Sequence, residues 1–506
     1  MQYFNNKYLL LFVTILFLVS CNSIRRYNEK FDEKIAPEKL QKDVTYIHKK
    51  LTKLHPQLYY YISKKDFDFK FDSLKKTIQE PLTRKEFFFK LSPIIASIKQ
   101  GHASVNVPIK RLTKDKKKVI NSTNLLTPMS DLEVEFYNQK LYVVKNKSVD
   151  SSIQIGTEII SVDSVKPITL FDKYYNTFAS DGLNTTFKKS MLNENIFAYY
   201  FVDQGYKDSV KLKLNDKGDT LIKMIKRNTN KVSKSPNKPG DRKNLDTKNC
   251  HLSFVGKDSN IALLKIDDFM SFSYERFFRK IDSVKSSKLI IDLRGNPGGA
   301  AFSCRKLFSY LIDTSYYFFN PYEVTSRTSL LQTRRFREKK MIGKLFHLAF
   351  LPITILRYGI RLSAVKKKED RYFYIPILYD LKVTPKKKYN FKNKIYVITN
   401  GGTFSSSCIL SSNLKGYKLA TFVGEETGGE YNGTCAGQMP TFILPYSKLK
   451  INFGIMYIKA SCSTDVYGHG IMPDIEIIPT LEDRIHQHDP ELEWILNDSK
   501  NQKQLD

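Results

Sequence analysis

The sequence predicts a multidomain α/β protein with helices first, then β-strands, then alternating strands and helices. Three patterns support this fold class. Apolar residues recur at helical spacing between residues 40 and 54, and strand patterns dominate residues 130–226. From residue 261 onward, apolar strand-like runs alternate with a helical pattern, which is typical of an α/β layer with a largely parallel sheet. At 506 residues, the chain is long enough for about two to four domains.

The composition indicates a folded protein with a basic surface. Lys and Arg outnumber Asp and Glu by 82 to 51, which gives a formal net charge of +31. Such an excess favours anionic surroundings, namely nucleic acid, acidic lipid head groups or acidic glycans. The lysines are scattered and no nucleic-acid module is evident, so no nucleic-acid partner is expected. No Cys/His spacing of a zinc site and no phosphate loop occurs, so no metal or cofactor is expected.

Residues 1–21 read as a targeting segment. Lys7 precedes an apolar run, residues 8–20, which is too short to cross a bilayer well. The run ends in Leu-Val-Ser-Cys at Cys21, which resembles the lipobox of bacterial lipoproteins. This resemblance implies cleavage before Cys21, acylation of its thiol, and a lipid-anchored protein of a bacterial cell envelope that faces the periplasm or cell exterior. An ordinary signal peptide with a chance cysteine is the alternative.

Residues 38–110 read as a helical domain. A capping box, Thr83 to Glu86, opens an apolar run that ends shortly before His102. From composition alone, His102 is an ordinary histidine at a helix end.

Residues 130–226 form a β-rich module, and residues 227–249 read as a linker because polar residues, Lys and Pro dominate without apolar periodicity. Residues 153–163 resemble the middle of a PDZ domain, a module that holds peptide ends by strand addition. The usual Gly-Leu-Gly-Phe-type carboxylate loop is not evident, so the PDZ-like domain is interpreted first as a scaffold.

Residues 250–480 form the α/β module, and one of its turns carries three serines. A buried-strand pattern ends at Thr399, two glycines follow, and Thr403 is predicted to cap a helix that begins with the serines. A helix N-terminus at that place directs free N–H groups at whatever a serine attacks. The alternative is that the serines only cap and solvate the helix.

Four motifs of this module resemble one enzyme family. They are Asp-Leu-Arg-Gly-Asn-Pro-Gly-Gly at 292–299, Gly-Gly-Thr-Phe-Ser-Ser-Ser at 401–407, Val-Gly-Glu-Glu-Thr-Gly-Gly at 423–429, and Gly-His-Gly-Ile-Met-Pro-Asp at 468–474. Together they resemble the tail-specific (carboxy-terminal processing) serine peptidases and their tricorn-like relatives. The resemblance covers roughly residues 38–478. It implies a catalytic domain of the ClpP/crotonase-like type and a peptide or protein substrate.

The resemblance implies that Ser405 is the nucleophile. It makes the backbone N–H groups of Gly298, Gly299 and Ser406 the candidates for the oxyanion hole.

The proton acceptor distinguishes two branches of the family. The processing branch uses a lysine after Phe-Gly in the third motif, where this chain has Glu430, so a Ser-Lys dyad is not supported. The tricorn-like branch uses a histidine from the N-terminal part, which implies His102. Asp465 is the first candidate for its acidic partner, and Glu430 is the second.

An insertion at 320–390 separates the first two motifs. Its centre, residues 341–362, is strongly apolar with basic flanks, but charged residues interrupt it too often for a membrane span. A lid or membrane-surface hairpin is one interpretation, and helices packed on the core are the other.

Cys435 and Cys462 flank a predicted hairpin formed by residues 441–444 and 450–458, and a disulfide is expected between them. Cys304 and Cys408 are expected to be small buried residues.

The sequence as a whole predicts a membrane-tethered serine endopeptidase or carboxy-terminal processing peptidase. A catalytically inactive peptide- or lipid-binding lipoprotein on the same fold is the alternative.

Overall fold

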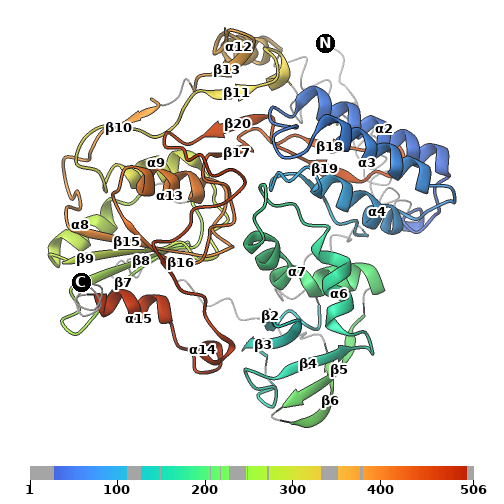
Figure 1. Cartoon of the computed structure of the whole chain (residues 1–506), viewed down its shortest axis with the longest axis horizontal. Coiled ribbons are helices and arrows are strands. Elements are labelled where there is room, and N and C mark those ends of the chain that lie inside the picture. Colours follow the sequence, from blue (N-terminus) through green and yellow to red (C-terminus); the bar gives the residue numbers. More distant parts are fainter. Residues whose placement is uncertain are drawn as a thin grey trace, which may run out of the picture.

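The computed structural model describes residues 28–110, 127–148, 150–205, 207–216, 218–226, 247, 249–270, 273–331, 351–376 and 380–498. They form a helical part, a β-rich part and an α/β part with a second sheet beside it (Figure 1). This mixed multidomain α/β architecture confirms the predicted fold class. Cys21 and most of the predicted linker lie outside the described residues.

The helical part contains α2 (Pro37–Leu54), α3 (Lys64–Thr77) and α4 (Arg84–Ala96). The predicted capping box is present, because the Thr83 side chain accepts from the Glu86 N–H and the Glu86 carboxylate accepts from the Thr83 N–H. The apolar residues at helical spacing in α2 are all buried, as predicted: Leu40, Val44, Ile47, Leu51 and Leu54.

The β-rich part is one antiparallel sheet in the order β2-β3-β4-β5-β6. Its strands are β2 (Leu132–Tyr137), β3 (Lys140–Asn146), β4 (Glu158–Val162), β5 (Ser209–Asp216) and β6 (Asp219–Lys226). Two helices, α6 (Pro167–Tyr175) and α7 (Thr186–Gln204), lie between β4 and β5 in the chain. The loop between these helices reaches the α/β part, because the Leu183 N–H donates to the Gly468 carbonyl.

The α/β part is built on a six-stranded sheet in the order β21-β16-β15-β9-β8-β7. All neighbours are parallel except the edge strand β7, which runs antiparallel to β8. The strands are β7 (Cys250–Val255), β8 (Ile261–Ile266), β9 (Lys288–Asp292), β15 (Lys394–Thr399), β16 (Thr421–Gly424) and β21 (Ile475–Glu476). The helices are α8 (Glu275–Ser283), α9 (Ala301–Phe308), α13 (Ser406–Gly416), α14 (Leu481–Ile485) and α15 (Pro490–Leu496).

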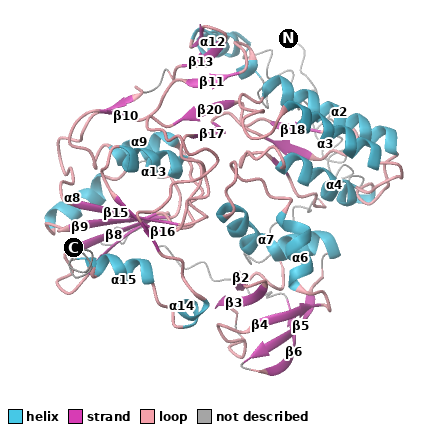
Figure 2. Cartoon of the chain, in the orientation of Figure 1, coloured by secondary structure: helices cyan, strands magenta, loops and turns pink. Residues whose placement is uncertain are grey.

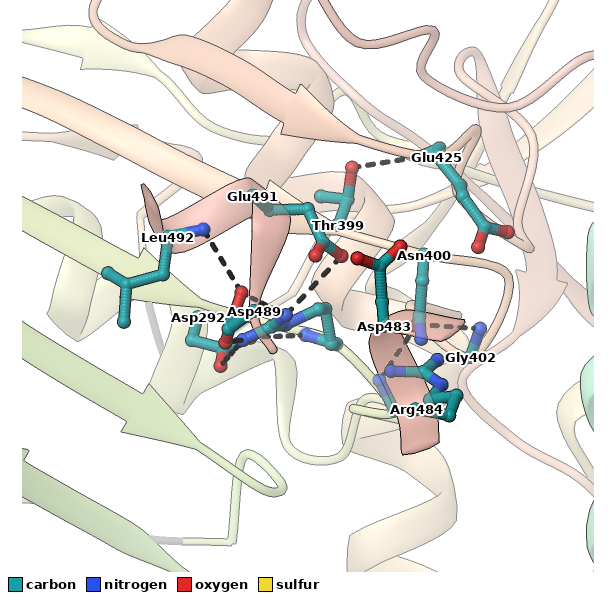
Figure 3. A network of polar contacts seen from close by, with 12 residues as sticks. Asp292, Thr399, Asn400, Gly402, Glu425, Asp483, Arg484, Asp489, Glu491 and Leu492 are labelled. Atoms are coloured by element: carbon teal, nitrogen blue, oxygen red, sulfur yellow. Dashed lines mark hydrogen bonds and ion pairs between the residues drawn. The ribbon is translucent and has the colours of Figure 1, made fainter. Parts of the chain in front are cut away.

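Three carboxylates gather at the carboxyl edge of this sheet, where Figure 3 shows Asp292, Asp489 and Glu491 converging. They surround the Arg294 guanidinium, which contacts Asp292 at 2.9 Å, Asp489 at 2.7 Å and Glu491 at 3.3 Å. Because Asp489 and Glu491 lie at the start of α15, Arg294 fastens this late helix to the strand edge that carries the Asp-Leu-Arg motif.

Another sheet, with five strands in the order β12-β13-β11-β20-β17, lies beside the six-stranded sheet. It contains β11 (Tyr322–Val324), β12 (Val365–Lys368), β13 (Arg371–Tyr374), β17 (Gly433–Ala436) and β20 (Met456–Lys459). Helix α12 (Leu351–Ser363) precedes β12. The short elements η1 (Ser329–Leu331), β10 (Tyr316–Tyr317) and β14 (Lys382–Val383) complete this region. No helix within the described ranges is long and apolar enough to cross a membrane.

A three-stranded sheet joins the helical part to the α/β part. Strand β1 (Ser104–Val105) begins two residues after His102 and pairs with β19 (Lys450–Asn452). Strand β19 also pairs with β18 (Thr441–Ile443). Figure 2 shows this small sheet beside the three N-terminal helices.

The predicted disulfide is wrong. The expected hairpin is divided between two sheets, since β18 pairs with β19 whereas β20 pairs with β17. Cys435 therefore lies opposite Tyr457, and Cys462 lies past the end of β20 against Gly416. Both thiols are free, and Cys304 and Cys408 are buried, as predicted.

Candidate active site

Ser405 occupies a strained turn between β15 and α13. Its backbone has φ 58° and ψ −121°, and a positive φ is unusual for a residue with a side chain. A nucleophile on a sharp strand-to-helix turn has its hydroxyl exposed above the sheet edge. The helix begins at Ser406 with Ser405 as its N-cap. Thr403 is therefore not the predicted helix cap, because its hydroxyl donates instead to the Leu293 carbonyl at 2.8 Å.

Asn296, from the Asp-Leu-Arg motif, holds this turn. Its Oδ1 accepts from the Gly298 N–H at 2.9 Å and from the Ser407 hydroxyl at 2.7 Å. Its carbonyl accepts from the Phe404 N–H at 2.9 Å. The side chain is fully buried, so these bonds form in a low-dielectric environment and connect the first motif rigidly to the serine motif.

The three predicted oxyanion donors differ in availability. The Gly298 N–H already donates to the Asn296 Oδ1. The prediction that this N–H serves the oxyanion hole is therefore wrong. It supplies space instead, since a Cβ on Gly298 would lie 2.8 Å from the Ser405 Cβ.

The N–H groups of Gly299 and Ser406 do not take part in the hydrogen bonds to Asn296. Gly299 forms a parallel β-bridge with Phe269. In this bridge the Phe269 N–H donates to the Gly298 carbonyl and the Ala300 N–H donates to the Phe269 carbonyl, so the Gly299 N–H is not used. Ser406 is the first residue of α13, where helical N–H groups have no intrahelical acceptor. The Ser406 hydroxyl donates to the Gly299 carbonyl at 3.3 Å, so the two residues are neighbours at the serine turn, and their N–H groups remain the candidates for the oxyanion hole.

His102 lies against Ser405. Its Nε2 is 3.0 Å from the Ser405 Oγ, and its ring centroid is 4.7 Å from that of Phe404. The two residues are 303 positions apart, so this contact joins the helical part to the serine turn. Burial lowers the pKa of His102 to about 4, so the imidazole is neutral at pH 7 and can accept a proton.

Asp181 was not singled out by the sequence, and it connects three segments at the site. Its Oδ1 accepts from the Gly101 N–H at 2.6 Å, and its Oδ2 accepts from the Glu430 N–H at 3.3 Å. The side chain is 2 % exposed, and burial raises the pKa of Asp181 to about 6. The only local signal was an Asp-Gly turn, which identifies a loop but not its neighbours.

Neither predicted acidic partner contacts His102. Asp465 is exposed and forms no hydrogen bond or ion pair with any described residue. Glu430 is buried, but its carboxylate accepts from the Asn432 side chain at 3.5 Å rather than from the imidazole. Burial, with a further contribution from Asp181, raises the pKa of Glu430 to about 7. The structure thus brings together Ser405 and His102 but not the acid expected beside them.

Among the described residues, no group of three or more His, Cys, Asp or Glu side chains could hold a metal ion.

Comparison with protein families agrees with the resemblance seen in the four sequence motifs. Residues 260–477 match the family model "Peptidase family S41". This part of the chain belongs to peptidase family S41. The resemblance drawn from the four motifs is confirmed, and the S41 domain is a serine peptidase domain, which implies a peptide or protein substrate. No curated protein matches the sequence significantly.

Several solved structures are similar over nearly the whole chain. Mature CPAF complexed with lactacystin is 16% identical, with a TM-score of 0.61, and the match covers 92% of this chain and 98% of that one. At this identity the likeness shows a shared fold. A putative peptidase from Parabacteroides merdae is 12% identical, with a TM-score of 0.46 and coverage of 92% and 96%. The photosystem II D1 C-terminal processing protease is 13% identical, with a TM-score of 0.43 and coverage of 88% and 96%.

Proposed function

We propose that this protein hydrolyses peptide bonds through an acyl-enzyme on Ser405, with His102 as the general base. The observation that carries the proposal is the 3.0 Å contact between the His102 Nε2 and the Oγ of a serine held at φ 58°. A strained nucleophile beside a neutral imidazole is the arrangement that acyl transfer requires.

The reaction then follows from the placement of these groups. Ser405 Oγ attacks the scissile carbonyl carbon while its proton moves to His102 Nε2, and the N–H groups of Gly299 and Ser406 stabilise the oxyanion. The imidazolium gives its proton to the leaving amine, and the C–N bond breaks to leave the acyl-enzyme. Water then attacks the ester with His102 again as the base, which releases the acid and restores Ser405.

Asp181 is assigned to positioning His102. Its carboxylate holds the N–H of Gly101, the residue directly before His102, so it fixes the turn from which the imidazole extends. When ionised, it also places a negative charge near the site, which favours the transient imidazolium. Glu430 is held to the same carboxylate through its backbone, so it is the better of the two predicted acids to approach His102 when substrate binds.

The proposal includes a membrane tether and an extracytoplasmic location in a bacterium. The apolar run that ends in Leu-Val-Ser-Cys at Cys21 supports acylation of that thiol. Cells fed a radiolabelled fatty acid should label the wild type but not Cys21→Ala, and equal labelling of both would contradict the tether. Carboxy-terminal processing, rather than general endopeptidase activity, is supported by the four motifs alone.

A fluorophosphonate probe tests the catalytic proposal. Folded wild-type protein should form an adduct on Ser405, located by peptide mapping, whereas Ser405→Ala and heat-unfolded wild type should not. The missing contact between an acid and His102 favours the second candidate function, an inactive peptide- or lipid-binding lipoprotein. Folded protein that binds peptide or lipid but gives no Ser405 adduct would establish that alternative.

A further inference from the structure

Helix α12 presents large apolar side chains to solvent. Ile353, Leu356 and Ile360 are 57%, 64% and 45% exposed. They are three and four positions apart, so they lie on one face of the helix. Side chains of this kind are usually buried, and a group of them on one exposed face indicates a contact surface.

A basic hairpin follows the helix directly. Lys366, Lys367 and Lys368 of β12 are exposed, and so is Arg371 at the start of β13. The turn between the strands carries two acidic residues, Glu369 and Asp370. The four basic side chains outnumber them, and the hairpin therefore has a net positive charge. Apolar and cationic groups therefore occur side by side in residues 353–371.

The helix is anchored to the rest of the protein directly after its C-terminal end. Ala364, which follows the helix, and Val365, the first residue of β12, are 7% and 4% exposed and fix the helix to the sheet that contains β12. β12 is the outer strand of that sheet, and Figure 1 shows α12 and β13 at the periphery of the molecule.

We propose that this surface, residues 353–371, docks on a membrane that contains anionic lipids. At 13 residues, α12 is roughly 20 Å long, which is too short to cross the hydrocarbon core but suits a helix lying in the interface. The lysines pair with acidic head groups while the isoleucine and leucine side chains enter the acyl boundary. A net charge of +31 for the whole chain also favours an anionic partner.

A second copy of the chain fits this surface less well. A two-fold contact would bring the same patch of both copies together, and each basic hairpin would then approach its own equivalent. Anionic lipid removes that repulsion. A lipid anchor at Cys21 would make this the second of two membrane contacts.

The docking surface lies apart from the proposed catalytic site. β12 and β17 are opposite edges of the five-stranded sheet, and β17 begins three residues after Glu430. Four inter-strand spacings place these edges roughly 19 Å apart. Membrane docking and Ser405 chemistry can therefore succeed or fail independently.

Vesicle flotation tests the inference with the full mature chain carrying Cys21→Ala, which removes acylation. The protein should float with phosphatidylglycerol/phosphatidylcholine vesicles, more weakly at high salt, and should not float with phosphatidylcholine alone. Combined Ile353→Asp, Leu356→Asp and Ile360→Asp should lower vesicle affinity at least tenfold. Ile222→Asp with Met224→Asp, on the exposed face of β6 at 62% and 58% exposure, is the matched control and should bind as the parent does.

A milder variant protects the test against misfolding. Leu356→Trp keeps the face apolar, and its fluorescence should shift to the blue with anionic vesicles, whereas Ile222→Trp should not shift. Unchanged flotation of a folded Asp variant, or no blue shift in the Leu356→Trp variant, would overturn the inference. A Leu356-dependent change in molecular mass without vesicles would also overturn it, in favour of self-association.

Discussion

The two halves of the proposed catalytic pair are held in different ways. Ser405 is fixed within one domain, by Asn296, by the close approach of Gly298, and by the start of α13. His102 belongs to another part of the chain and depends on the Asp181 carboxylate and on the pairing of β1 with β19. The nucleophile is thus a local property of two motifs, whereas the base is a property of domain assembly.

A second buried aspartate forms the same kind of link away from the site. Asp43 on α2 accepts from the N–H groups of Tyr446 and Ser447, at 2.9 and 2.7 Å, and its side chain is fully buried. Asp43 and Asp181 each join distant segments through two backbone donors. They differ in that only Asp181 holds the residue next to His102, so Asp43 is a matched control.

The largest expected effect comes from removing either half of the pair. His102→Ala should lower acylation nearly as much as Ser405→Ala, on the order of a thousandfold or more, because members of such a unit act together. The measurement is single-turnover acylation by an activated ester, with folding checked by circular dichroism. Wild-type acylation by folded His102→Ala would show that another group, starting with Glu430, is the base.

A smaller effect is expected from Gly298→Ala, which disturbs only the turn that holds the nucleophile Ser405. The new methyl group would lie 2.8 Å from the Ser405 Cβ and 2.9 Å from the Ser406 nitrogen, so the turn must move. A misplacement of reacting groups by about 1 Å lowers a rate roughly a hundredfold, and we expect a loss of that order in acylation. Gly359→Ala on α12 meets nothing within 4 Å and should leave the rate unchanged. Equal rates for both variants would mean that Gly298 does not shape the site.

The same contrast explains which features the sequence predicted. The strands that end at Asp292 and Thr399, and the placement of Ser405 after them, follow from apolar runs and glycine-rich turns close together in the chain. Asp181 could not be found in this way, because its two acceptor contacts join positions 80 and 249 residues away. The disulfide prediction failed for a related reason, since strands adjacent in sequence entered different sheets.

A third comparison separates positioning from general stability. Asp181→Asn replaces one acceptor oxygen with an amide that faces a backbone N–H, so one of its two bonds is lost and the His102 turn loosens. Hydrogen bonds to charged groups contribute about 1.5–3 kcal/mol, so acylation should fall about tenfold at neutral pH. Asp43→Asn loses an equivalent bond and should lower the melting temperature without changing acylation. A similar loss of acylation in both variants would assign Asp181 a purely structural role.

The last expected effect is on stability rather than on rate, as a pH dependence that Asp181 adds. Burial raises its pKa from 3.8 to about 6, so between these values the folded protein binds more protons than the unfolded chain. The stability linked to this group is therefore fully present below pH 3.8 and is lost as the pH rises through 6. A carboxyl pKa that rises from 3.8 to about 6 on folding corresponds to about 3 kcal/mol of unfolding free energy.

Asp181→Asn removes this titration, so the difference in unfolding free energy between wild type and variant should move in favour of the variant from pH 4 to pH 7.5. Urea unfolding at both pH values, followed by a probe attached to the helical part, measures that change. Asp163→Asn is the control, because the effect of burial is outweighed by hydrogen bonds from Lys207, Lys211 and Tyr200, which lower the pKa of Asp163 in the folded protein. The stability linked to Asp163 is therefore already present at pH 4, and the Asp163→Asn difference should change little up to pH 7.5. If the Asp181→Asn difference is the same at both pH values, the carboxylate does not titrate between them. If it moves as expected while acylation falls, Asp181 is a charge that costs stability at neutral pH and is retained because it holds His102 against Ser405.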